Sequence, residues 1–204
     1  MCCKESRVSS ITYVVLEFII LILILFGTAF DQYRLKSQNS NGSVAAVVEN
    51  AFNNGNCVTL WGAKQQCYTG GYSLNGTKAF WDNCPERQRQ FRAAEVLSIA
   101  SVGLVALSVV CGILFLCCCT CVRYFLFVLG LLNFATLCVT WALVVDGFIG
   151  AQDSDGVVRA SQDANDTLTC AAMNSQDYRY GVGFCLLVAG WGLQFFNGII
   201  LIAC

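Results

Sequence analysis

The sequence predicts an all-α membrane protein, in which four transmembrane helices form a bundle and the first outer loop carries a small extracellular β-sheet. Of the 204 residues, 56% are hydrophobic and only 12% are charged, whereas about one-quarter of the residues in a soluble domain are charged. Four apolar stretches have the length of about 20 residues that a helix needs to cross a bilayer. They cover residues 11–30, 96–117, 124–145 and 181–203. We therefore interpret residues 1–204 as a single four-span membrane domain.

The first apolar stretch has a second interpretation as a signal peptide. Lys4 and Arg7 precede it, and Gly27-Thr28-Ala29 resembles a small-residue cleavage site. We favour a membrane span, because the apolar run is long for a signal sequence. Its removal would also leave three spans, with the chain ends on opposite sides of the membrane.

The orientation of the spans follows from the loops. Four spans place both termini on one side of the membrane and the two large loops, residues 31–95 and 146–180, on the other. Basic residues are more numerous in the loops, and by the positive-inside rule this would place the loops in the cytosol. That rule weakens, however, for loops of about 60 residues. Asn41, Asn75 and Asn165 begin Asn-x-Ser/Thr sequons, are all in the loops, and are the glycosylation candidates. We expect a plasma-membrane protein with cytoplasmic termini and extracellular loops.

The loops contain four of the 14 cysteines, namely Cys57, Cys67, Cys84 and Cys170. Four cysteines on the oxidising side of a membrane can pair in three ways. Cys57 and Cys67 form the natural local pair. The hypothesis that remains by elimination is a second disulfide between Cys84 and Cys170, which would tie the two loops together.

The other cysteines adjoin or lie within the membrane. Cys2 and Cys3 precede the first span and are palmitoylation candidates. A cluster near the inner end of the second span is poorly suited to a metal, because adjacent cysteines at one helix end cannot all converge on one ion and the chain has no histidine. We expect neither a metal site nor a cofactor. The cluster comprises Cys117, Cys118, Cys119 and Cys121.

The first loop contains local structure signals. Residues 57–61 alternate in polarity and Gly70-Gly71 and Asn75-Gly76 are turn signals, so a small sheet is expected. Residues 44–52 have the apolar spacing of a short amphipathic helix. Pro85 is typical of a helix start, and this helix should run directly into the second span.

The first turns of that helix are basic, because they contain Arg87, Arg89 and Arg92. One interpretation is a contact with anionic lipid or glycan. We favour the other, which is a solvated helix face.

Four polar side chains fall inside the predicted spans, where such groups are costly and often functional. They can line one polar seam, which is either a proton or ion path or a set of interhelical hydrogen bonds. We favour hydrogen bonds, with Glu17 either protonated or paired with Arg123. The pair Ser108 and Gly112 has the spacing of a close helix contact. The four polar residues are Glu17, Asn133, Gln194 and Asn197.

The loop from residue 57 to residue 67 resembles the signature of the amastins, four-span surface glycoproteins of trypanosomatid parasites. The match runs from Cys57 through Lys64 and returns at Cys67, while Gln66 replaces the usual Asp, Glu, Asn or Thr. A more distant likeness is to the claudins, whose first outer loop carries a Leu-Trp pair and a cysteine pair on a small sheet. The matching signature residues are Cys57, Thr59, Leu60, Trp61, Gly62, Lys64 and Cys67.

Three functions compete at this stage. The resemblance implies a surface glycoprotein that contacts a host membrane or surface component through its first outer loop, with Trp61 either exposed for contact or packed against the helix tops. The alternative is an oligomeric ion or proton channel that uses Glu17 and the seam. An enzyme is poorly supported, because no nucleophile has an evident base. The partners expected are the lipid bilayer, a host component and further copies of the chain, and a net charge of −1 favours no nucleic acid.

Overall fold

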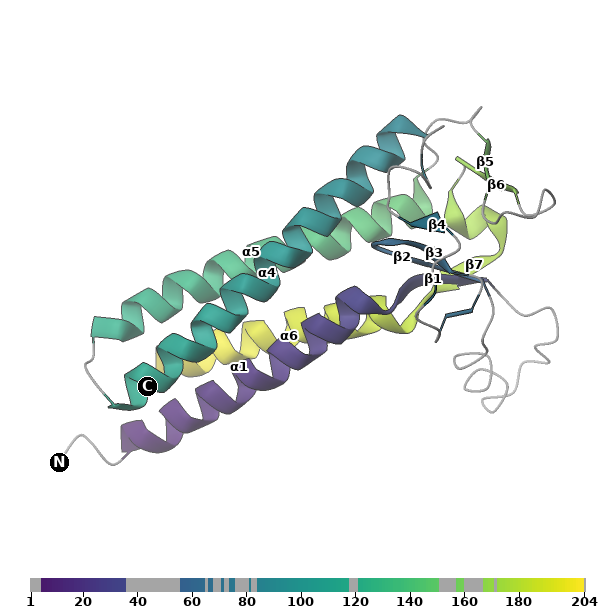
Figure 1. Cartoon of the computed structure of the whole chain (residues 1–204). Helices are drawn as coiled ribbons and strands as arrows, with labels where there is room; N and C mark the ends of the chain where they lie inside the picture. The colour runs from purple at the N-terminus through teal and green to yellow at the C-terminus, as the bar shows by residue number, and fades with distance from the viewer. Residues whose placement is uncertain are drawn as a thin grey trace.

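The computed structural model describes residues 5–35, 56–64, 66–67, 71, 74–75, 81, 84–117, 121–150, 157–159, 167–170 and 172–203. Four long helices lie along a common direction and a sheet lies at one end of them (Figure 1). All four are long and apolar enough to cross a membrane, which confirms the predicted spans. The helices are α1 (Glu5–Ala29), α4 (Pro85–Cys117), α5 (Cys121–Ile149) and α6 (Val182–Ala203).

Helix α4 shows how the sequence sets the length of a helix. It begins at Pro85, as predicted, and continues without interruption for 33 residues. At 1.5 Å per residue this is about 50 Å, while the hydrocarbon core of a bilayer is about 30 Å thick. The first turns of α4 therefore stand above the membrane and pack against the sheet.

One of the three arginines in the first turns of α4 does not lie on the solvated face that we expected. Arg87 is fully buried, its guanidinium lies 5.3 Å from the centre of the Trp81 ring, and it donates a hydrogen bond to the Gly150 carbonyl at 3.2 Å. The prediction is wrong for Arg87, because a cation can be buried where an aromatic face and a carbonyl receive it. Arg89 does match the prediction, since its ion pair with Glu86 is exposed.

The outer sheet has five strands in the order β4-β3-β2-β1-β7, and every pair is antiparallel. Four strands come from the first loop, where a small sheet was predicted. Strand β7 comes from the second loop and pairs with β1. The two loops therefore build one sheet. The strands are β1 (Asp31–Leu35), β2 (Cys57–Thr59), β3 (Gly62–Lys64), β4 (Leu74–Asn75) and β7 (Tyr178–Tyr180).

The second loop contributes three further short elements. Strands β5 (Val157–Arg159) and β6 (Thr167–Thr169) form a separate two-stranded sheet. The 3-10 helix η1 (Met173–Gln176) precedes β7. The amphipathic helix expected at residues 44–52 lies outside the described residues.

Apolar side chains hold the sheet to the bundle in one continuous core. Tyr33 and Leu60 of the sheet region pack with Phe91 of α4 and Val144 of α5, and all four are buried. Inside the bundle, a methyl group at Gly112 would lie 2.9 Å from Val14 Cγ2. Since so little space separates α4 from α1 there, the small residue predicted at this helix contact is required.

We call the sheet residues of β1, β2, β3 and β7, together with the turn at Leu60 and Trp61, the outer platform. Helix α1 begins and α6 ends at the opposite end of the bundle (Figure 1). Large aliphatic and aromatic side chains on all four helices are at least half exposed, such as Phe18, Val110, Leu131 and Ile202. Their exposure suits helices that face lipid.

Candidate functional site

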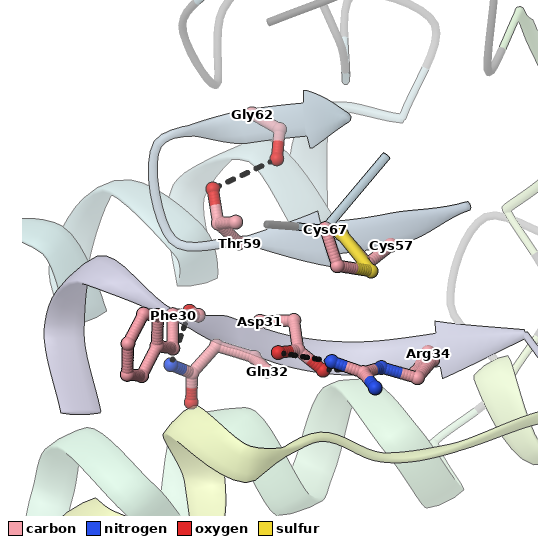
Figure 2. Close-up of a disulfide and its surroundings, with 8 residues drawn as sticks. All are labelled: Phe30, Asp31, Gln32, Arg34, Cys57, Thr59, Gly62 and Cys67. Atoms are coloured by element: carbon pink, nitrogen blue, oxygen red, sulfur yellow. Dashed lines mark hydrogen bonds and ion pairs between the residues drawn. A yellow bond between two sulfur atoms is a disulfide. The ribbon is translucent and has the colours of Figure 1, made fainter. Parts of the chain in front are cut away.

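The signature loop forms a tight hairpin between β2 and β3. The Thr59 hydroxyl donates to the Gly62 carbonyl at 2.9 Å and accepts the Trp61 N–H at 3.1 Å, which closes the turn (Figure 2). Gly62 has a φ of 144°, a backbone conformation that side chains with a Cβ rarely adopt. Thr59 and Gly62 are therefore needed for the shape of the turn.

The two residues at the tip of the turn anchor the hairpin to the bundle. Leu60 is completely buried in the core beneath the sheet. Trp61 is partly buried against the same core, and its indole N–H donates to the Thr28 carbonyl at 2.8 Å. Of the two roles considered for Trp61, the structure has the packed one. Thr28 is in the last turn of α1, where carbonyl groups lack helical partners.

Two disulfides cross-link the loops at the platform end of the bundle. Cys57 and Cys67 are joined with a Cα–Cα distance of 5.6 Å, and Figure 2 shows this bridge beside β1. Cys84 and Cys170 are joined with a Cα–Cα distance of 5.8 Å. The second bridge fastens the start of α4 to the second loop. Both pairings are those the sequence favoured, and Lys64 lies opposite Cys57 in the hairpin.

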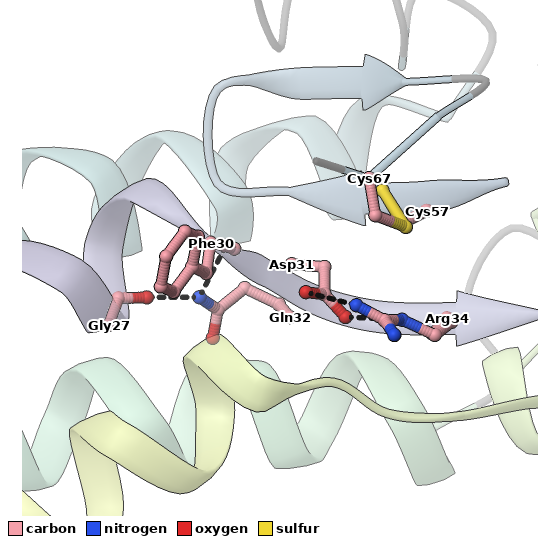
Figure 3. A network of polar contacts seen from close by, with 7 residues as sticks. All are labelled: Gly27, Phe30, Asp31, Gln32, Arg34, Cys57 and Cys67. Carbon is pink, nitrogen blue, oxygen red and sulfur yellow. Dashed lines mark hydrogen bonds and ion pairs between the residues drawn. A yellow bond between two sulfur atoms is a disulfide. The ribbon is translucent and has the colours of Figure 1, made fainter. Parts of the chain in front are cut away.

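Strand β1 carries a buried ion pair that the sequence analysis missed. Asp31 and Arg34 are 1% and 2% exposed. Arg34 Nε donates to Asp31 Oδ2 at 3.0 Å and the terminal nitrogen donates to Oδ1 at 2.9 Å (Figure 3). Such a two-pronged contact compensates both charges and fixes their relative geometry. The charges had looked like ordinary loop residues.

The link between β1 and the bundle was also missed. Gln32 donates its side-chain amide to the Gly27 carbonyl at 2.7 Å (Figure 3), and its backbone carbonyl accepts the Gly181 N–H at 2.8 Å. A methyl group at Gly181 would collide with Asp31, and one at Gly183 would lie 2.8 Å from the Asp31 carbonyl. Glycines before and at the start of α6 are the signal that indicates such a close approach.

Tyr33 joins the platform to α5. Its hydroxyl donates to the Val144 carbonyl. Burial raises the pKa of Tyr33, so the hydroxyl keeps its proton and remains a donor. A row of stacked rings continues beside it through Phe148, Tyr180 and Phe184, with centroids 4.1 and 4.2 Å apart.

Inside the bundle, two of the four predicted polar residues, Gln194 and Asn197, contact α1, which carries a third, Glu17. Gln194 Nε2 donates to Glu17 Oε1 at 3.1 Å, and Asn197 Nδ2 donates to the Tyr13 carbonyl at 3.4 Å. Asn133 is also fully buried, on α5. The favoured interpretation as interhelical hydrogen bonds therefore describes the contacts between α1 and α6.

Of the two states considered for Glu17, the pairing with Arg123 is wrong. Arg123 donates instead to the carbonyls of Leu201 and Ile202, at 3.1 and 2.9 Å. These carbonyls belong to the last turn of α6, where cationic side chains are favourable. Arg123 is therefore used to cap a helix, and it does not neutralise Glu17.

Several predicted modification sites lie beyond the described chain. Asn41, Asn165, Cys2 and Cys3 are outside the described residues. Asn75 is described, in β4, where it pairs with Gly62. No group of three or more His, Cys, Asp or Glu side chains that could hold a metal ion occurs among the residues whose placement is described.

Four apolar helices beneath a disulfide-linked sheet define a four-span membrane protein. The amastin family model, described as Amastin surface glycoprotein, matches residues 18–201, and the chain belongs to this family. It is thus a multi-pass membrane surface glycoprotein, from a family that is not known for enzymes. No curated protein and no solved structure matches the chain significantly, so the claudin likeness stays a prediction.

Proposed function

We propose that the protein lies in the plasma membrane with both termini in the cytoplasm and the outer platform outside the cell. Both disulfides are in the loops at the platform end, and disulfides persist on the oxidising side of a membrane. Changing Asn41, Asn75 and Asn165 singly to Gln tests this. A mobility shift after glycosidase treatment that depends on any one of them supports the orientation, and protection of the loops from protease on intact cells overturns it.

In that position the protein mediates contact between the parasite surface and a host membrane or surface component through its first outer loop. The observation that carries this proposal is how firmly the platform holds both ends of residues 36–55. At one end, Leu35 N–H donates to the Asn56 carbonyl at 3.1 Å and the neighbouring Arg34 is in the buried ion pair. At the other end, Cys57 is in a disulfide.

The arrangement assigns different tasks to the signature and to the segment it holds. Leu60 and Trp61 face the core and α1, so they stabilise the platform. We assign recognition to the chain between Leu35 and Asn56, because a rigid scaffold that positions a binding loop is a common design. Fixing the ends of a loop in advance also lowers the entropy that binding costs.

The test replaces residues 44–54 with a Gly/Ser sequence of equal length in the full-length protein, which leaves the sequon at Asn41 intact. Attachment of parasites to host-cell membranes should fall while the amount of protein at the surface is unchanged. A Gly/Ser replacement of residues 160–164 in the second loop is the control and should retain attachment. Equal attachment by both variants would refute the contact function.

An oligomeric ion or proton channel is the second candidate function. The observation in its favour is Glu17, a carboxylate that is fully buried within a membrane span. Ion or proton flux in liposomes, compared between the wild type and Glu17→Gln, tests it. Flux that the substitution removes supports a channel, while an equal rate for both proteins removes this candidate.

A further inference from the structure

Four buried polar side chains gather around Glu17 in the half of the bundle away from the platform. We call these four and Glu17 the Glu17 cluster. They come from three helices: Tyr13 and Glu17 from α1, Ser108 from α4, and Gln194 and Asn197 from α6. None is more than 3% exposed. Tyr13 and Asn197 are close enough to the Glu17 carboxylate to interact with it, and Ser108 is similarly close to Tyr13.

The hydrogen bonds of the cluster do not engage five of its side-chain oxygen atoms. Gln194 donates an amide N–H to Glu17 Oε1, and Asn197 donates an amide N–H to the Tyr13 carbonyl. The side-chain oxygens Gln194 Oε1 and Asn197 Oδ1 are buried and accept no hydrogen bond from the described residues. Glu17 Oε2 and the hydroxyl oxygens of Tyr13 and Ser108 likewise have no hydrogen-bond partner in that part of the chain. Buried polar atoms without partners are costly, so five in one place require an explanation.

The charge of the cluster also lacks a partner within the bundle. Residues 96–114, 124–145 and 182–202 contain no charged side chain, and Arg123 donates to the end of α6. A carboxylate buried in hydrocarbon without compensation is strongly unfavourable. Glu17 is therefore either neutralised by a proton or balanced by a positive charge that comes from outside the chain.

We propose that the Glu17 cluster is a binding site for a monovalent cation, Na⁺. Oxygen atoms are the ligands that hard cations select, and the cluster offers them from a carboxylate, two amides and two hydroxyls. A proton on Glu17 Oε2 would supply one donor for one acceptor, whereas a cation satisfies several oxygens at once. The single negative charge matches a monovalent ion, because a divalent ion would leave a net charge in the membrane.

This site is independent of the proposed contact function. It ties α1, α4 and α6 together in the half of the bundle farther from the platform, so its loss leaves the outer platform in place. A bound ion also does not imply that ions pass through the bundle, since a closed site stabilises without transport.

The experiment measures the thermal unfolding midpoint of the full-length protein in nanodiscs, in sodium chloride and in choline chloride of equal ionic strength. Because a ligand that binds only the folded state stabilises it by mass action, the midpoint of the wild type should rise steadily with the sodium concentration. Glu17→Gln should remove this dependence. Ser108→Ala, which deletes one oxygen, should shift it to sodium concentrations about tenfold higher, a change of about 1.4 kcal/mol in binding.

The matched control is Asp146→Asn, which removes a carboxylate at the platform end of α5. Asp146 accepts a hydrogen bond from Gln90 and is remote from the cluster, so this variant should keep the full response to sodium. A wild type with the same midpoint in sodium and choline overturns the proposal and leaves a protonated Glu17. If Glu17→Gln does not fold, an unchanged sodium response in Ser108→Ala overturns it equally.

Discussion

The outer platform and the Glu17 cluster each bury a carboxylate, but they compensate it in opposite ways. Asp31 meets the guanidinium of Arg34 through two hydrogen bonds. Glu17 has only neutral neighbours, because its Oε1 accepts a hydrogen bond from the Gln194 amide and the side chains beside it are Tyr13 and Asn197. The chain therefore balances its buried charge completely in the platform and incompletely in the membrane.

This difference indicates what each region is for. A buried pair with both partners in the chain fixes one geometry, which suits a scaffold that presents a loop. A buried carboxylate with neutral neighbours leaves room for a charge that arrives from solution. The platform is accordingly a structural element, and the cluster is a binding element.

The largest effect in this comparison should follow from breaking the platform pair. Arg34→Ala leaves the Asp31 carboxylate buried and unpaired, and the free energy of unfolding should fall by about 3–5 kcal/mol. Thermal unfolding of the purified full-length protein measures this, together with its amount at the cell surface. Arg89→Ala, which breaks the exposed pair with Glu86, is the control and should behave as the wild type. Equal behaviour of the two variants would show that the platform pair is dispensable.

The second effect concerns the signature disulfide. Replacing Cys57 and Cys67 with Ala removes a bridge that spans a sequence separation of 10, which should cost about 2–3 kcal/mol through the entropy of the unfolded chain. The thermal unfolding midpoint should fall, and a reducing agent should no longer lower it through this bridge. Cys185→Ala, at an exposed free cysteine, serves as the comparison and should have no effect. An unchanged midpoint in the double variant would show that the hairpin is held without its bridge.

The sequence predicted the parts of the fold that depend on local composition. Long apolar runs specify the four spans, Pro85 specifies the start of α4, and four cysteines in two loops restrict the pairing. The sequence placed Glu17 and Gln194 inside predicted spans, but it did not show that these two side chains face each other. Which side chains meet depends on the offset between two helices, and this offset is set only by their packing.

What the sequence did not predict depends on partners that are distant along the chain. Strand β7 has three residues, too few for an alternating pattern, and it forms because β1 offers an edge. Arg87 is buried because its guanidinium lies over the Trp81 ring and donates to the Gly150 carbonyl. The role of Asp31 depends on Arg34 being turned back along the strand, and no period in the sequence signals such a turn.

The third effect tests the turn of the signature. Gly62→Ala should cost about 1–3 kcal/mol, because a side chain is strained at a φ of 144°. The midpoint of thermal unfolding gives the size of this effect. Gly103 of α4 offers a matched control, since nothing lies within 4 Å of a methyl group there and alanine is the better helix former. Gly103→Ala should be neutral or stabilising, and a similar loss in both variants would contradict the role of the turn.

The smallest effect decides whether Trp61 is an anchor or a contact residue. Trp61→Phe keeps an aromatic ring but loses the hydrogen bond to the Thr28 carbonyl, which should lower stability by about 0.5–1.5 kcal/mol. Attachment to host membranes, corrected for the amount of protein at the surface, should not change, because the recognition segment is the chain between Leu35 and Asn56. Attachment lost at unchanged stability would make Trp61 itself the contact residue. The signature would then belong to the recognition surface, and the division between a structural platform and the segment it presents would no longer hold.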